Sequence, residues 1–143
     1  MKKKWIPIAI VVVLLVGFVI SIPLANNLLA KNAERQLLEL SLPDQTTVAD
    51  SLWTTGKLTG NGNGMQHFGA MLLKSELTLD ELSAYYSQAL PNVVVKAQKT
   101  QRIECIETQE LSFDTDVTDG NYYVVYLFCD SSSPVLNLDL RGH

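Results

Sequence analysis

The chain has few of the residues from which catalytic and metal sites are built. Its 143 residues include two histidines, His67 and His143, and two cysteines. A serine triad needs a histidine beside a positioned serine and carboxylate, and the sequence has no Gly-x-Ser-x-Gly elbow. A zinc site needs ligands beyond one histidine, once the two cysteines are used elsewhere. We therefore expect no enzymatic activity and no bound cofactor.

Basic residues are scarce beyond the first 43 positions of the chain. Residues 44–143 contain six Lys and Arg against thirteen Asp and Glu, a formal charge of −7. Such an acidic surface repels a phosphate backbone, which argues against nucleic acid as a partner. The same sign of charge disfavours adsorption on anionic lipid.

Polar residues are nearly absent from residues 5–25, where Ser21 is the one polar side chain. At about 1.5 Å per residue this run forms a helix about 31 Å long, which matches a bilayer hydrocarbon thickness of about 30 Å. Three lysines at positions 2–4 precede the run, and lysines beside a first span favour the cytoplasmic side. We therefore expect a single-pass signal anchor in the cell membrane, with residues 1–4 cytoplasmic and the remainder extracytoplasmic.

A cleaved signal peptide is the competing interpretation, because it also has a basic start and an apolar stretch. Its apolar stretch is usually shorter than the run seen here. A cut after Ala25 would also place Pro23 where a small residue is needed. We therefore favour the uncleaved transmembrane helix over residues 5–25.

The helical pattern continues through residues 26–43 as a juxtamembrane stalk. Its apolar residues recur at spacings of four and three, at Leu29, Ala33, Leu37 and Leu40. This stripe either pairs with a second copy in a homodimer or rests on the chain's own domain. Two heptads are short for a coiled coil, so we favour packing on the domain. Pro43 ends the helix, because the residue before a proline is driven out of the α region.

Residues 44–143 are expected to form one extracytoplasmic α+β domain. Thr78 and Glu81 form a capping box, which begins a helix that Pro91 ends. Strands are predicted from β-branched, aromatic or alternating residues over 52–59, 65–74, 93–95, 103–113, 122–129 and 136–140. The run 122–129 is apolar or aromatic throughout, which is typical of a central strand buried on both faces. One helix packed on a mostly antiparallel sheet is the simplest arrangement of these elements.

Cys105 and Cys129 both fall in predicted strands and, under this topology, in an oxidising compartment. We expect them to form a disulfide that stabilises the domain. A redox pair is disfavoured, because Cys-x-x-Cys spacing and a helix start that lowers a thiol pKa are both missing.

A stretch rich in glycine and asparagine joins the first two predicted strands. Asn-Gly pairs supply the positive φ angles of a tight hairpin turn. The stretch fits neither a dinucleotide fingerprint nor a Walker loop. Because glycines allow close approach to the backbone, a contact loop is the alternative interpretation. This contact loop comprises Gly60, Asn61, Gly62, Asn63, Gly64, Met65, Gln66 and His67.

Three aspartates precede a glycine later in the chain, at Asp114, Asp116 and Asp119. Converging carboxylates are calcium ligands, but the spacing differs from the EF-hand loop and its final glutamate is missing. We favour a solvated hairpin turn at Asp119 and Gly120, and expect no metal site.

The segment GKLTGNGNGMQHFGA at 56–70 is followed by Lys74-Ser75, Glu81-Leu82 and Tyr85-Tyr86. Over roughly residues 42–90 this pattern resembles uncharacterised small bacterial proteins with one membrane span and an extracytoplasmic domain. The resemblance implies no activity and no ligand residues. The sequence as a whole predicts a non-catalytic binding or accessory module whose partner is an envelope or membrane protein. The alternative is a sensor of a small ligand or ion, which would use the contact loop or the acidic turn.

Overall fold

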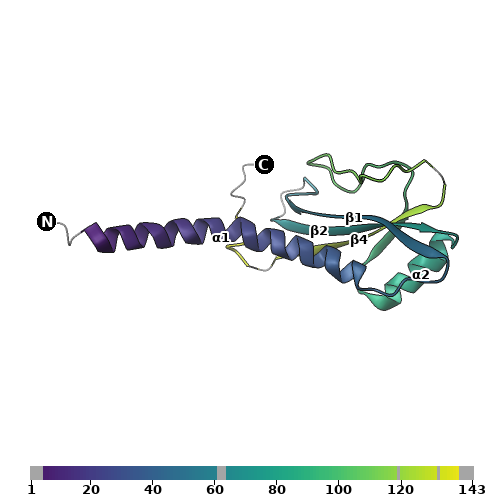
Figure 1. Ribbon diagram of the computed structural model, residues 1–143, viewed down its shortest axis with the longest axis horizontal. Coiled ribbons are helices and arrows are strands. Elements are labelled where there is room, and N and C mark those ends of the chain that lie inside the picture. Colours follow the sequence, from purple (N-terminus) through teal and green to yellow (C-terminus); the bar gives the residue numbers. More distant parts are fainter. Residues whose placement is uncertain (1–4, 61–63, 119, 132, 139–143) are drawn as a thin grey trace.

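The computed structural model describes residues 5–60, 64–118, 120–131 and 133–138. Its first element is α1 (Trp5–Leu38), a single helix of 34 residues. Every residue in 5–21 is exposed, and Figure 1 shows this half of α1 projecting away from the sheet. Helix α1 is long and apolar enough to cross a membrane. It continues without a break into the predicted stalk but ends at Leu38, ahead of Pro43.

Four antiparallel strands form one sheet in the order β1-β2-β4-β3. They are β1 (Thr46–Gly56), β2 (Gln66–Ser75), β3 (Val94–Ala97) and β4 (Tyr122–Asp130). The central strands are β2 and β4, with His67 opposite Cys129. A register shift between Val48 and Asp50 places an irregularity in β1. The predicted α+β class is confirmed, and the predicted strand at 122–129 is one of the two central strands.

Two helices cover one face of the sheet: the predicted packed helix, and the second part of α1, which rests on the domain as its apolar stripe predicted. Helix α2 (Leu79–Ala89) begins with the predicted capping box of Thr78 and Glu81. The second half of α1 lies on the same face (Figure 1). The core on this face is formed by Ala33, Leu37, Met71, Leu73, Leu82, Tyr86, Val125 and Leu127. The part of α1 beyond the apolar run is therefore packed on the domain, as favoured over pairing with a second copy.

Segments without regular secondary structure cover the opposite face of the sheet. The core there contains Leu58, Phe68, Ala70, Leu72, Ile103, Ile106, Phe113, Val124 and Tyr126. The predicted strand at 103–113 is wrong, because this segment folds back on itself. Arg102 and Ser112 form an isolated bridge, and the Ile103 N–H donates to the Leu111 carbonyl at 2.8 Å. Its apolar side chains enter the core from a folded loop, so their spacing does not follow the strict alternation of a strand.

The predicted last strand at 136–140 is also wrong in the part that is described. Residues 134–137 form a turn, in which the Asn137 N–H donates to Ser133 O and the Leu138 N–H donates to Val135 O, each at 3.2 Å. Leu138 is 51% exposed and covers no core. The alternation of leucines with polar residues therefore does not mark a strand here.

Candidate functional site

Helix α1 lies so close to β2 that their backbones are in contact. A Cβ atom added to Gly69 would overlap the backbone nitrogen of Glu34 and lie 2.5 Å from the carbonyl carbon of Ala33. Ala30 and Ala33 are fully buried on the side of α1 that faces the domain. Small residues on both elements therefore set the distance between helix and sheet.

A buried polar network joins α1 to the sheet near the end of the apolar run. His67 is 1% exposed, and its Nε2 lies 2.9 Å from Asn26 Oδ1. Its Nδ1 lies 3.0 Å from the carbonyl oxygen of Cys129 on β4. Asn26 Nδ2 donates to the carbonyl oxygen of Leu136 at 3.1 Å. His67 and Asn26 together link α1, the two central strands and the turn at 133–138.

Burial lowers the pKa of His67 below its ordinary value of 6.5, because desolvation disfavours the imidazolium. The hydrogen bond to the Cys129 carbonyl and the negative charge of Asp130 act in the opposite direction and are smaller. At neutral pH the ring is therefore uncharged. Its role in this geometry is to hold structural elements together.

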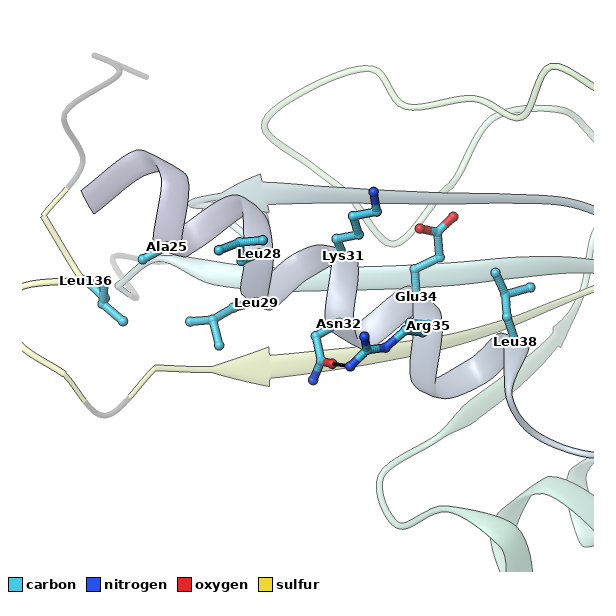
Figure 2. Close-up of a pocket in the computed structure, with 9 residues that line it drawn as sticks. All are labelled: Ala25, Leu28, Leu29, Lys31, Asn32, Glu34, Arg35, Leu38 and Leu136. Carbon is cyan, nitrogen blue, oxygen red and sulfur yellow. Dashed lines mark hydrogen bonds between the residues drawn. The ribbon is translucent and has the colours of Figure 1, made fainter. Parts of the chain in front are cut away.

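The side of α1 that faces away from the sheet carries the open groove drawn in Figure 2. We call this side the outer face and define it by Leu28, Lys31, Asn32, Arg35 and Leu38. The groove has a volume of about 790 Å³. Arg35 Nη2 donates to Asn32 Oδ1 at 2.7 Å, and Arg35 Nε lies 3.6 Å from Glu39 Oε1. Leu28 is 68% and Leu38 is 43% exposed, so two exposed leucines flank two exposed cations.

The predicted disulfide between Cys105 and Cys129 is wrong, because both residues are free cysteines in the structure. Cys105 packs against the core under the loops, whereas Cys129 packs against the core under the helices. The sheet therefore lies between the two sulfur atoms. Burial raises the pKa of both thiols, which keeps them protonated and weakly nucleophilic at neutral pH.

Three of the five described residues of the predicted contact loop lie inside the fold, and Gly60 and Gly64 are exposed. Met65, Gln66 and His67 are buried, with exposures of 2%, 8% and 1%. Gln66 Oε1 accepts hydrogen bonds from the backbone N–H and the hydroxyl of Thr59, at 3.1 and 3.0 Å. These three side chains cannot meet a ligand without unfolding the start of β2. Their part in the contact loop is therefore corrected to a structural one.

Local geometry explains why glycine stands at two described positions of this loop, Gly60 and Gly64. Gly60 has a φ of 65°, which favours glycine over other residues. A Cβ atom on Gly64 would lie 2.7 Å from Asn137 Oδ1, so a side chain at position 64 would displace the Asn137 amide. Asn61, Gly62 and Asn63 lie outside the described part of the chain.

The acidic segment is held in place by a carboxylate from β1. Asp50 Oδ2 accepts hydrogen bonds from the N–H groups of Asp114 and Thr115, at 2.8 and 2.9 Å. The predicted residue Asp116 is exposed, and Asp119 lies outside the described residues. Within the described ranges, no three His, Cys, Asp or Glu residues gather closely enough to hold a metal ion. Asp50 thus satisfies two backbone donors of the segment.

Comparison of the chain with protein-family models, with curated proteins and with solved structures gives no match. The resemblance of the segment at 56–70 to single-span bacterial proteins therefore stays a prediction.

Sequence reasoning missed Asn26, Gly69 and Asp50, which position the elements around the site. Asn26 could have been found, because it stands four residues after Ile22 and four before Ala30 on the buried stripe of α1. Gly69 also carried a signal, because an isolated glycine in a strand pattern indicates close backbone approach. Asp50 had no comparable signal, since its partners lie more than sixty residues away.

Proposed function

We propose that this protein is a membrane-anchored, non-catalytic accessory module that binds another membrane protein through the outer face of α1. In this proposal residues 1–4 are cytoplasmic, and the folded domain is extracytoplasmic at the cell membrane. The lysines at positions 2–4 support this orientation. One observation carries the proposal: α1 runs unbroken from the apolar run into the domain, and its outer face is left open along that length.

The groove favours a helical partner that crosses the bilayer beside α1 and continues above it. Leu28 and Leu38 offer apolar contacts at the two ends of the outer face, and both are well exposed. Lys31 and Arg35 stand between them, and Arg35 already pairs with Glu39, so a partner with a carboxylate opposite Lys31 fits best. The partner chemistry is therefore an apolar helix with carboxylates just outside the membrane.

A second copy of this chain fits the outer face less well. Two parallel copies in one membrane would bring like residues together across a helix pair. Lys31 would then face the same cation on the other copy, and like charges at an interface oppose association, whereas Arg35 is already paired with Glu39. This argument favours a different protein over the homodimer.

Because α1 is packed closely on the sheet, a partner bound to α1 would also set the position of the whole domain. Gly69 touches the backbone of α1, and the network of Asn26 and His67 fixes the helix at a second point. No flexible linker separates the apolar run from the domain, because α1 is continuous through both. A partner that grips the outer face would therefore hold the domain at a fixed height and rotation.

Photocrosslinking in intact cells tests the proposal. The full chain carries a photoreactive amino acid at Leu38 on the outer face, and the control carries it at Leu79, which is similarly exposed on α2. We expect a discrete adduct with one membrane protein from position 38 and none from position 79. The adduct should disappear when Lys31→Glu and Arg35→Glu are added.

Two results would contradict this function. Equal adducts from positions 38 and 79 would show that the outer face has no special role. An adduct that survives reversal of both charges would rule out an acidic partner at this face.

A further inference from the structure

The height of the outer membrane boundary along α1 follows from the proposed span, on which this inference rests. Trp5 is 70% exposed at the start of the helix, and tryptophan is enriched where a span leaves the hydrocarbon. At about 1.5 Å per residue, a hydrocarbon layer of about 30 Å ends near Ala25. The polar headgroup layer adds about 5–7 Å on each side, which corresponds to about four more residues of helix.

The turn at 133–138 is held at this height by a hydrogen bond to α1. Asn26 Nδ2 donates to the carbonyl oxygen of Leu136 at 3.1 Å, and Asn26 is one residue beyond the expected boundary. Figure 2 shows Leu136 at the same end of the groove as Ala25 and Leu29, away from Leu38. The turn therefore lies level with the headgroup layer.

The domain also covers α1 slightly below that level. Ile22 is only 3% exposed, although its neighbours Ser21 and Leu24 are exposed. Ile22 stands three residues before Ala25, inside the expected hydrocarbon layer. With the boundary at Ala25, this burial places part of the fold at the depth of the acyl chains.

The turn presents apolar side chains where a soluble loop would carry polar ones. Val135 is 38% and Leu138 is 51% exposed. Each lies within two residues of Leu136, whose carbonyl fixes the height of the turn. Exposed apolar side chains at the boundary of a membrane gain free energy by entering it.

We propose that the turn at 133–138 is a second membrane contact, in which Val135 and Leu138 enter the outer leaflet at the level of the headgroups. The occupant of this surface is lipid, because the turn is continuous with the apolar run through Asn26 and lies at the boundary height. With the span, this contact makes two points of attachment. Two points limit the tilt of α1 and of the domain relative to the membrane plane, whereas rotation about the membrane normal stays free.

Fluorescence quenching by lipid measures this contact directly. The full chain is placed in phosphatidylcholine nanodiscs whose lipids carry bromine near the top of the acyl chains, in a background with Trp5→Phe and Trp53→Phe. Single tryptophans are introduced as Val135→Trp or Leu138→Trp. We expect both to lose most of their emission in brominated lipid relative to plain lipid, and to emit at shorter wavelength than a tryptophan in water.

Two further single-tryptophan variants serve as controls on the same helix. Leu38→Trp replaces a residue of similar exposure that lies 13 residues beyond Ala25, about 20 Å higher at about 1.5 Å per residue, and should show no loss of emission. Leu24→Trp lies inside the span and should be quenched. An unquenched tryptophan at position 24 would show that α1 does not span the bilayer, which overturns the proposed function and this inference together.

Quenching at position 24 without quenching at 135 and 138 would overturn this inference alone. Quenching by acrylamide, which is dissolved in the water, then shows where the turn lies. Tryptophans at 135 and 138 that acrylamide quenches would place the turn in water. Tryptophans reached by neither quencher would place it against protein. Because the two variants are made at separate exposed positions, loss of folding in one, seen as a lowered melting temperature, leaves the other as the test.

Discussion

His67 Nε2 lies 2.9 Å from Asn26 Oδ1, and its other ring nitrogen lies 3.0 Å from a backbone carbonyl of β4. Both neighbours are hydrogen-bond acceptors in this arrangement, whereas a neutral imidazole has a single N–H to donate. The protonated ring would satisfy both, but burial opposes its charge and is the larger effect. The charged form of His67 would make both hydrogen bonds, whereas the neutral form makes one and avoids the desolvation of a buried charge.

We predict that the domain loses stability as the pH falls below 6.5, in part through His67. The pKa of His67 is lowered in the folded state, so the unfolded chain takes up the proton first. Its contribution to stability is complete above pH 6.5 and is lost as the pH falls toward the lowered pKa of the folded state. Thermal melting of the full chain in detergent at pH 7.5 and pH 5.0 measures the loss.

The variant His67→Gln isolates this contribution. It should melt at a lower temperature at pH 7.5, because it cannot reproduce both contacts of the ring. Its further loss between pH 7.5 and pH 5.0 should be smaller than that of the native chain. An identical pH dependence in both proteins would remove His67 from this account.

We predict that Gly69→Ala disrupts the docking of α1 on β2. The added methyl group would overlap the backbone of the helix at Glu34, and backbone cannot move aside as a flexible side chain can. Overpacking of this kind costs about 1–3 kcal/mol. The control is Gly120→Ala, where nothing lies within 4 Å of the added atom. Equal urea midpoints for the two variants in detergent would show that α1 is not packed as described.

The elements that the sequence predicted well are those specified by neighbouring residues. The capping box of Thr78 and Glu81 acts over three residues, and helix α2 begins where that signal places it. Strand β4 was marked by its own run of apolar and aromatic residues. Local signals of this kind depend on no other part of the chain, so they can be recognised from the sequence before the fold is known.

The elements that it missed depend on register and on contacts between distant segments. Whether Cys105 and Cys129 share a face is decided by the pairing of β4 and by the path of a loop, and neither is written in their spacing. The burial of His67 depends on Asn26, 41 residues away. Polar residues beside a glycine-rich turn are typical of a binding loop. In the fold, however, α1 covers His67, and the sequence around His67 does not indicate this.

We predict that both thiols are free and slow to react in the native protein. Burial raises the pKa of each thiol, so little thiolate forms at neutral pH. Unreduced full-length chain should titrate two thiols in denaturant, and only a small fraction of them in the same time without denaturant. No titratable thiol in denaturant would instead demonstrate a disulfide and contradict the placement of the cysteines on opposite faces.

We predict opposite outcomes for removing the hydroxyl groups of two adjacent tyrosines. Tyr86 is fully buried, and its hydroxyl has no hydrogen-bond partner in the described part of the fold. Burial, with a smaller effect from Tyr85, raises its pKa to about 12. An unpaired buried polar group costs about 1–3 kcal/mol, so Tyr86→Phe should melt at or above the native temperature. The Tyr85 hydroxyl donates to the Ser41 carbonyl at 3.0 Å, and Tyr85→Phe should therefore melt slightly lower. A larger loss in Tyr86→Phe than in Tyr85→Phe would mean that the buried hydroxyl has a partner, because removing an unpaired group cannot cost more than removing a bonded one.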